Sequence, residues 1–333
     1  MAATAALGAA CTSASTSAST STSTTVTPQA STVSTTAPPS IPTGSTKLTV
    51  DRYLTIDGLD MPIDAYVPTG PGPWLVVVTF HGRSSAFKDA ESNTLIAEQA
   101  TAEGMLVFAP TWIAGDPFPL DAEDIVDLRH AASCAVSFAQ QWAIELGGDP
   151  TATVTHGFSA GAGPALSALV APSADVPECA VATAPLSVAG AVLGDGEYFF
   201  QSQPFDTAFA DDLAAMQAEV AGLSNPDQWP SGLDASVFVW AAEDGTAPKA
   251  IDDPNAPNWL DDRDPDGSIA IDLERLGRLA DGVVDYVDAA GFIDLRLGEA
   301  GLDSEFEVFR GGHTVADKIE PLVAALRAVG AGE

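Results

Sequence analysis

A serine between two glycines, in the stretch Gly157-Phe158-Ser159-Ala160-Gly161, constrains the fold of this chain more than any other feature. A β-branched run, 152–155, precedes it, and a run of small residues suited to a helix, 162–170, follows it. Strand, sharp turn and helix in this order are typical of a nucleophile elbow, where glycines leave room for a strained turn that exposes the serine hydroxyl. A plain turn in which serine caps a helix is the alternative. Partners elsewhere in the chain must therefore decide between the two interpretations.

The segments before this turn alternate between strand and helix. A continuous apolar run such as Trp74 to Phe80 is typical of a strand buried on both faces of a parallel sheet. The alternation predicts an α/β fold with a doubly wound, mostly parallel sheet, whose binding crevice lies at the carboxyl ends of the strands. The expected elements are an antiparallel strand pair over 46–67, strands over 74–80 and 105–109, and helices over 89–103 and 121–146.

The order is expected to change after the turn. A sixth strand is predicted over 179–184, and the aromatic-rich stretch 185–233 is too long for a simple connection. It is interpreted as a cap-like insertion over the site or as an ordinary packed subdomain. Residues 46–333 are thus expected to form one catalytic domain. Its later elements are predicted as strands over 235–240 and 305–309 and helices over 271–289 and 316–329.

Three side chains follow the ends of predicted strands: His81, Trp112 and Ser159. Because the carboxyl ends of parallel strands share one edge of a sheet, we expect the three to lie together. His81 and Trp112 are accordingly the expected substrate-binding residues.

Serine at neutral pH needs a neutral imidazole as its base, and a carboxylate to orient that imidazole. The chain has four histidines. His130 lies inside a predicted helix, His156 lies on the same strand as Ser159, and His81 lies where the loop for the oxyanion begins. His313 remains, in a glycine-flanked loop after the last predicted strand, and is the expected base.

Asp244 is the expected carboxylate, because it stands just past the predicted strand over 235–240. The resulting order of Ser159, Asp244 and His313 is the one expected on this architecture. The alternatives are Glu243 and the Asp261-Asp262 pair.

A tetrahedral oxyanion needs two backbone N–H groups that already point at it. The first is expected from Ala160, at the start of the helix after the serine. The second is expected from the loop after His81-Gly82, from Arg83 in preference to Ser84.

Over 46–333 the chain resembles the α/β-hydrolase superfamily, in particular its secreted carboxylesterase and dienelactone-hydrolase-like branch. Many of the similar enzymes carry His-Gly-Gly-Gly where this chain has Arg83 and Ser84 in place of the later glycines. The tolerance of tertiary alcohols associated with the glycine version therefore need not carry over. The motifs that carry the resemblance are Phe80-His81-Gly82, Gly147-Gly148-Asp149-Pro150, Gly157-Phe158-Ser159-Ala160-Gly161, Glu243-Asp244-Gly245 and Gly311-Gly312-His313-Thr314.

These residues and the resemblance together predict a serine carboxylic-ester hydrolase that acts through an acyl-enzyme on a small-molecule or polymer ester. Ser159 is expected to attack, His313 to take and return the proton, and Asp244 to hold the imidazole. The alternatives are a serine peptidase or acyltransferase on the same fold, or a non-catalytic surface-binding lipoprotein. No metal or organic cofactor is implied.

Residues 1–45 are expected to be separate from the fold. Leu7-Gly8-Ala9-Ala10-Cys11 resembles a bacterial lipobox, so Cys11 is a candidate for lipidation and the rest of the Ser/Thr-rich stretch a disordered tether. The apolar start lacks basic residues and is interpreted as the end of an export signal. The alternative is a disordered extension of a secreted protein. Export to the extracellular face of the envelope, with a membrane contact only through the lipid, is the expectation.

Cys134 and Cys179 are the two cysteines left over, and an even pair in an oxidising compartment predicts a disulfide. Two buried free thiols are the alternative.

The formal net charge is −33 at pH 7. Phosphate backbones would be repelled, and the Lys and Arg needed to bind them are scarce, which argues against a nucleic-acid partner. The acidic surface is compatible with a salty habitat, where the repulsion is screened.

Overall fold

The computed structural model describes residues 46–82, 87–113, 122–183, 188–196, 226–243 and 286–332. All of them lie in the range that the sequence predicted as the catalytic domain. The predictions for residues 1–45, including the lipidation of Cys11, lie outside the described residues.

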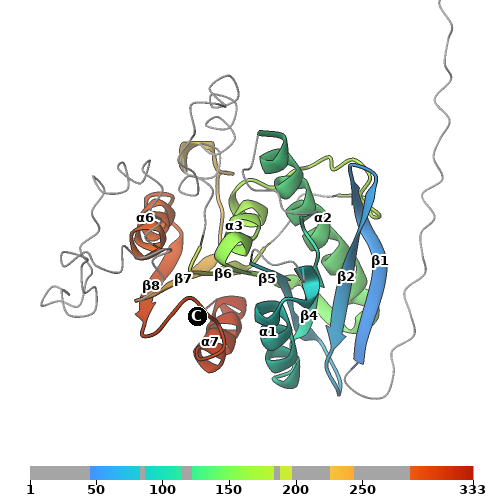
Figure 1. The fold of residues 1–333 in the computed structure, drawn as a ribbon, viewed down its shortest axis with the longest axis horizontal. Helices are drawn as coiled ribbons and strands as arrows, with labels where there is room; N and C mark the ends of the chain where they lie inside the picture. The colour runs from blue at the N-terminus through green and yellow to red at the C-terminus, as the bar shows by residue number, and fades with distance from the viewer. Residues whose placement is uncertain are drawn as a thin grey trace, which may run out of the picture. The chain divides into compact units, whose positions relative to one another are not determined.

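The described strands form one eight-stranded sheet in the order β1-β2-β4-β3-β5-β6-β7-β8 (Figure 1). β1 and β2 pair antiparallel, β2 pairs antiparallel with β4, and the remaining neighbours are parallel. The predicted α/β fold with a mostly parallel sheet is confirmed. The strands are β1 (Thr46–Ile56), β2 (Leu59–Val67), β3 (Trp74–Phe80), β4 (Leu106–Pro110), β5 (Gly148–Phe158), β6 (Gly190–Gly194), β7 (Ser236–Ala242) and β8 (Asp303–Phe309).

Helices cover both faces of this sheet. In Figure 1, α2 and α3 lie side by side on one face, and α1 and α7 lie together on the other. No helix within the described ranges is long and apolar enough to cross a membrane. The α-helices are α1 (Glu91–Ala102), α2 (Ala122–Leu146), α3 (Ala162–Val170), α6 (Tyr286–Glu299) and α7 (Ile319–Ala331), and the short 3-10 helices are η1 (Phe87–Asp89), η2 (Ser159–Gly161) and η4 (Pro226–Gln228).

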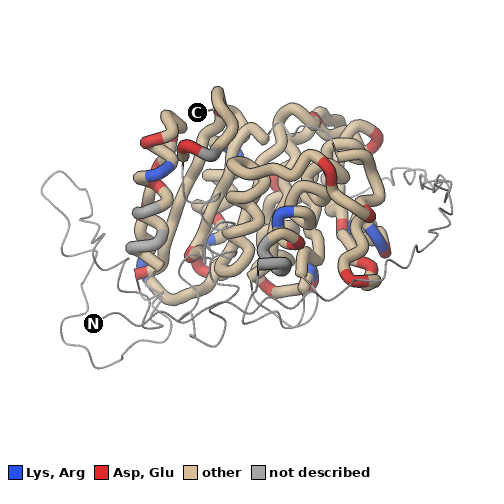
Figure 2. The backbone as a smooth tube through the Cα atoms, turned by 90° about the horizontal axis from the view of Figure 1, so that it is seen from above, with Lys and Arg blue, Asp and Glu red and all other residues tan. Residues whose placement is uncertain are grey.

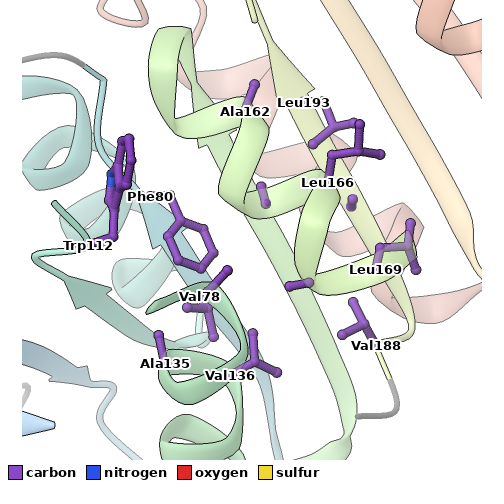
Figure 3. Close-up of a cluster of buried hydrophobic side chains, with 14 of the residues drawn as sticks. Val78, Phe80, Trp112, Ala135, Val136, Ala162, Leu166, Leu169, Val188 and Leu193 are labelled. Carbon is purple, nitrogen blue, oxygen red and sulfur yellow. The ribbon is translucent and has the colours of Figure 1, made fainter. Parts of the chain in front are cut away.

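The two faces of the sheet bury separate hydrophobic clusters. Along β3, Val76, Val78 and Phe80 face the cluster under α2, α3 and α6, whereas Val77 faces the cluster under α1 and α7. Full burial of each such side chain contributes roughly 1.5–3 kcal/mol. Figure 3 shows the first cluster, where side chains of β3, α2, α3 and β6 point toward one another.

The sixth strand lies later in the chain than predicted. β6 is Gly190–Gly194, inside the stretch 185–233 that was expected to be an insertion, and 179–183 forms bends and irregular backbone rather than a strand. The residues after β6, 197–225, lie outside the described residues. The cap therefore stays a prediction, and it can only begin after β6.

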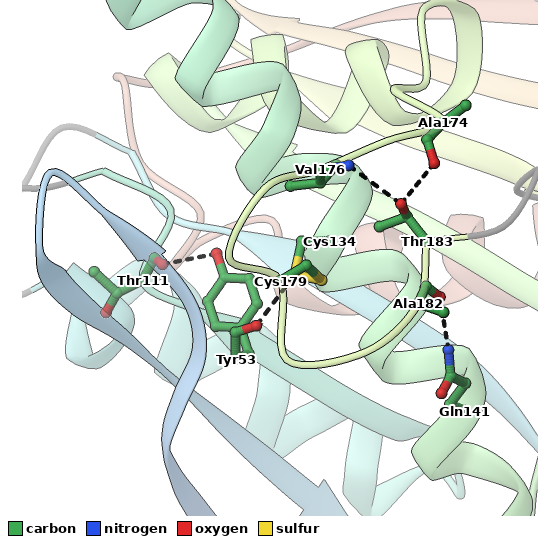
Figure 4. Close-up of a disulfide and its surroundings, with 9 residues drawn as sticks. All are labelled: Tyr53, Thr111, Cys134, Gln141, Ala174, Val176, Cys179, Ala182 and Thr183. Atoms are coloured by element: carbon green, nitrogen blue, oxygen red, sulfur yellow. Dashed lines mark hydrogen bonds between the residues drawn. A yellow bond between two sulfur atoms is a disulfide. The ribbon is translucent and has the colours of Figure 1, made fainter. Parts of the chain in front are cut away.

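Residues 179–183 do not join the sheet because a set of contacts holds the segment around Cys179 over α2 (Figure 4). The predicted disulfide between Cys134 of α2 and Cys179 is confirmed. Next to it, the Ala180 N–H donates to the Tyr53 carbonyl at 2.8 Å, and Gln141 Nε2 donates to the Ala182 carbonyl at 2.9 Å. The apolar run thus covers α2 and reaches β1, so it does not add to the sheet beside β5.

The helix predicted over 271–289 continues further than expected. The helix α6 runs from Tyr286 to Glu299 and passes through Gly291, beyond the predicted end at residue 289. Apolar side chains at helical spacing are buried on both sides of that glycine: Val287 and Ala290 before it, Ile293 and Leu297 after it. Because burial of this face outweighs the cost of one glycine, about 1 kcal/mol, the helix continues.

Charged residues are spread widely over the described surface. Figure 2 shows acidic positions on many separate helices and turns, with far fewer basic ones among them.

A buried chain of hydrogen bonds joins β5, β3 and α1. Asn93 Nδ2 donates to the Thr79 carbonyl at 3.2 Å, which turns Asn93 Oδ1 toward the Thr79 hydroxyl, 3.1 Å away. That hydroxyl donates to Asn93, so it accepts from the Nδ1–H of His156 at 2.9 Å. The Nε2 of His156 is buried without a hydrogen-bond partner. His156 is thus a neutral structural histidine, which agrees with its exclusion as the catalytic base.

Burial lowers the pKa of His156 to about 3. Below pH 6.5 His156 is protonated in the unfolded chain but stays neutral in the folded chain. The stability contributed by the neutral histidine is therefore complete above pH 6.5 and is lost as the pH falls toward 3. The loss amounts to about 1.4 kcal/mol per pH unit. We expect the free energy of unfolding to drop by about 2 kcal/mol less between pH 7.5 and 5.0 in His156→Asn than in the unmodified chain. Urea titrations at the two pH values measure this, and equal drops in the two proteins would refute it.

Candidate active site

Ser159 lies at the sharp turn between β5 and α3. Its φ angle is 55°, in the left-handed region that a non-glycine residue rarely adopts. It is the first residue of η2, directly before the fully buried helix α3. The order of strand, strained turn and helix predicted for a nucleophile elbow is therefore present, and the interpretation as an ordinary helix-cap serine is excluded because Ser159 makes no cap at η2 or α3.

Close backbone contacts explain both flanking glycines. A Cβ at Gly157 would lie 2.1 Å from the carbonyl oxygen of Gly161, and a Cβ at Gly161 would lie 2.2 Å from the carbonyl oxygen of Phe80. No side chain fits at either position. The turn is therefore packed against itself and against the end of β3.

The end of β3 also reaches the serine. A Cβ at Gly82 would lie 3.1 Å from the Cβ of Ser159 and 3.2 Å from the carbonyl oxygen of Phe158. The loop expected to supply an oxyanion donor thus begins against the elbow. Ala160, the other expected donor, is buried in η2, whereas Arg83 lies outside the described residues.

His81 and Trp112 hold the end of β3 from inside the protein. His81 Nδ1 contacts the Gly82 carbonyl at 2.7 Å, and because a carbonyl accepts, Nδ1 carries the hydrogen. Burial lowers the pKa of His81 to about 4, against the opposing effect of this hydrogen bond. Trp112 Nε1 donates to the His81 carbonyl at 2.9 Å. Both side chains are fully buried, so these contacts are structural, and a role in substrate binding stays a prediction.

The segment η1 is fixed on the other side of residues 83–86. The Phe87 ring packs edge-on against His81, with ring centroids 6.0 Å apart. Lys88 Nζ lies 2.9 Å from the Oδ2 of Asp64, a fully buried carboxylate on β2. Both neighbours of this loop are therefore anchored, one by hydrogen bonds and the other by an ion pair.

His313 follows the end of β8, and its imidazole lies between two aromatic rings. The Phe158 and Tyr286 ring centroids are each 4.6 Å from that of His313, and the Tyr286 ring is tilted by only 11°. Because Phe158 directly precedes Ser159, these contacts bring the imidazole to the elbow. The side chain of His313 remains 32% exposed, so one edge is open to solvent.

Asp195 is the carboxylate on this imidazole. Its Oδ2 lies 3.0 Å from His313 Nδ1, and its Oδ1 accepts the backbone N–H of Ala242 at the end of β7. The Asp195 N–H donates to the Trp240 carbonyl at 2.9 Å. The side chain is completely buried and φ is 43°, so the residue is held at a strained turn directly after β6.

The sequence predicted Asp244 for this place, and Asp244 lies outside the described residues. Asp195 was missed because the sixth strand was expected over 179–184, which hid the true strand end. A signal was present: the apolar run before Gly194-Asp195-Gly196 ends in Asp-Gly, just as the run before Glu243-Asp244-Gly245 does.

The arrangement has a defined chemistry. The carboxylate of Asp195 accepts from the Nδ1–H of His313, which leaves Nε2 with a free lone pair as a proton acceptor. Ser159 directly follows Phe158, whose ring contacts this imidazole, and stands at the strained turn. Such a set can deprotonate a hydroxyl and use it as a nucleophile.

Solved structures share this fold. No family model matches the chain, and no curated protein matches it. An esterase from Thermogutta terrifontis, Est2 with bound propionate, is 17% identical, with a TM-score of 0.53 over 85% of this chain and 92% of the esterase. The same esterase phosphoramylated by tabun is 18% identical, with a TM-score of 0.52 over 88% of this chain and 97% of the esterase. The chain has the α/β-hydrolase fold of these esterases.

The elbow glycines provide a test of this geometry. We expect Gly157→Ala to give little soluble folded protein, or a free energy of unfolding that is lower by several kcal/mol, because the added Cβ would overlap the Gly161 carbonyl. Gly298→Ala is the matched control, since its Cβ would meet nothing within 4 Å and it lies in a helix. The control should be neutral or slightly more stable. Soluble yield and urea midpoints measure both, and equal behaviour of the two variants would contradict the elbow.

Proposed function

We propose that this chain is a serine hydrolase that cleaves carboxylic esters through an acyl-enzyme. The observation that carries the proposal is one cluster: Ser159 at a strained elbow, with the His313–Asp195 pair held against the neighbouring Phe158 ring. This cluster contains a nucleophile, a base and the group that orients the base.

In the proposed reaction the Ser159 hydroxyl oxygen attacks the ester carbonyl carbon while His313 Nε2 takes its proton. The bond to the alcohol oxygen then breaks, and the imidazolium returns the proton to the leaving alcohol. Water attacks the acyl-enzyme with the same base, and the carboxylic acid and free serine are released. Asp195 stays ionised and stabilises the imidazolium.

The N–H of Ala160 is proposed as one oxyanion donor, since it follows the nucleophile at the start of the helical segment. The N–H of Arg83 is proposed as the second. It directly follows Gly82, where a Cβ would lie 3.1 Å from the Cβ of Ser159.

The structural neighbours support a serine hydrolase over other uses of the fold. Thermogutta terrifontis esterase 2 is described as phosphonylated by sarin and phosphorylated by paraoxon, which are reagents for activated nucleophiles. Structures with propionate and butyrate bound indicate that short carboxylates occupy that enzyme. For this chain we accordingly propose short-chain carboxylic esters as the first substrates to test.

The disulfide between Cys134 and Cys179 supports export, because disulfides persist in oxidising compartments. We retain the proposal of a secreted or envelope-attached enzyme with lipid on Cys11. Mass spectrometry of the mature N-terminus from a native host would test it.

The nucleophile is tested by labelling with a fluorophosphonate probe. We expect one label on Ser159 of the intact chain, no label on Ser159→Ala, and a loss of ester hydrolysis of about a million-fold. Circular dichroism of the variant supplies the folding control. A well-folded chain that never reacts with the probe would favour a non-catalytic binding protein, and cleavage of a peptide panel in preference to short p-nitrophenyl esters would favour a peptidase.

The carboxylate is tested by a pair of isosteric variants. Asp195→Asn should lower kcat by about 10³- to 10⁴-fold, because the amide stabilises the wrong tautomer of His313 and no imidazolium. Asp244→Asn should change kcat by less than about threefold, the scale expected when a charge outside the reacting set is removed. If the large loss appears in Asp244→Asn instead, the carboxylate is Asp244 and the role assigned to Asp195 is wrong.

A further inference from the structure

Lys318 is a cation buried directly behind the His313 loop. The chain holds 13 Lys and Arg against 46 Asp and Glu, so cations are scarce. Even so, the Lys318 side chain is 2% exposed. A buried ammonium is costly unless all its protons have acceptors, so its partners indicate its purpose.

The ammonium of Lys318 has three protons and three acceptors. Nζ donates to the Gly312 carbonyl at 3.1 Å, to the Thr314 carbonyl at 3.0 Å and to Asp317 Oδ1 at 2.7 Å. The two carbonyls belong to the residues on either side of His313. One cation therefore fixes the backbone before and after the imidazole.

These carbonyls are the ends of a tight turn with His313 at its centre. The Thr314 N–H donates to the Gly312 carbonyl at 2.8 Å, an i to i+2 bond, and His313 is not among the residues with positive φ. This is the pattern of an inverse γ-turn. A three-residue turn has one internal hydrogen bond, so the ammonium adds two further bonds to a motif that would otherwise be weakly held.

The same cation also contacts the aromatic cluster behind the imidazole. Lys318 Nζ lies 5.8 Å from the centre of the Trp240 ring, which stacks on Phe158 with centroids 5.9 Å apart. Phe158 in turn contacts His313. The turn and the ring surface against which the imidazole packs thus share one support.

We propose that Lys318 is a positioning residue for the catalytic base: its ammonium ties the two ends of the turn that carries His313 and holds the imidazole at the distance and angle needed for proton transfer. The inference rests on the function proposed above. Lys318 touches no reacting atom, because its three donors are all used within the loop. Asp317 compensates its charge from the surface, and the hydrogen bond to Lys318 lowers the pKa of Asp317.

The test uses two substitutions that keep the length of the side chain approximately. Lys318→Met removes all three donors, and Lys318→Gln keeps two N–H donors without the charge. We expect kcat for a short p-nitrophenyl ester to fall about 10- to 100-fold in Lys318→Met, with KM within about twofold, since misplacement of a base by a fraction of an ångström to 1 Å has effects of this order. The kcat of Lys318→Gln should lie between that of the unmodified chain and that of Lys318→Met. If Lys318→Met fails to fold, Lys318→Gln still tests the proposal.

The rate of fluorophosphonate labelling separates positioning from folding. We expect the final stoichiometry on Ser159 to stay near that of the unmodified chain in both variants, while the rate of labelling falls in the same proportion as kcat. Arg327→Met is the matched control, because this substitution also removes one positive charge. Arg327 lies on α7 and pairs with Glu103. It should leave kcat, KM and the labelling rate unchanged.

Two different failures can be told apart. If the unmodified chain is not labelled at Ser159, the proposed function fails and Lys318 has no base to position. If the unmodified chain is labelled but both Lys318 variants react at its rate, the positioning role is overturned. A lower melting temperature with an unchanged labelling rate would likewise overturn it, because a merely structural lysine changes only stability.

Discussion

The contact between the end of β3 and the turn after β5 is the constraint on which the candidate site depends. The elbow can lie against the Phe80 carbonyl only because Gly161 has no Cβ, and the same approach sets Gly82 against Ser159. One steric contact therefore holds Ser159 in its strained conformation and places Gly82, where the expected oxyanion loop begins, beside it. Fully buried α3 then keeps the turn from relaxing outward, since any outward shift would open space in the core.

The parts predicted correctly from the sequence are those decided by short-range patterns. The elbow, the apolar strand β3 and the antiparallel pair β1–β2 each depend on neighbours within a few residues: glycine spacing, continuous hydrophobicity and alternation. His313 was selected as the expected base by elimination among four histidines, and its catalytic role stays a prediction. The structure agrees for His156 and His81, both of which are buried and neutral.

The parts that were missed depend on contacts between distant segments. Residues 179–184 and 190–194 are both short apolar runs, and nothing local distinguishes the one that joins the sheet. The choice is made by the bonds of Cys179 and Ala180 to α2 and β1. Since that choice fixes where the sixth strand ends, it also decides whether Asp195 is seen as a catalytic candidate. The burial of Lys318 could not be predicted from the sequence for a similar reason, because it depends on the path of the loop around this side chain.

The carboxylate on His313 follows one strand and is held at the end of the next. Asp244 was expected because it follows β7, and Asp195 follows β6, yet the Asp195 carboxylate accepts from Ala242, the last residue of β7. The strained turn after β6 therefore carries the side chain sideways across the sheet edge to the end of the next strand. A buried carboxylate needs donors, and this edge supplies two, a backbone N–H and an imidazole. What the imidazole of His313 needs is a carboxylate beside Nδ1 whose lone pairs all have donors. A residue that follows β6 or one that follows β7 can supply it at this edge of the sheet.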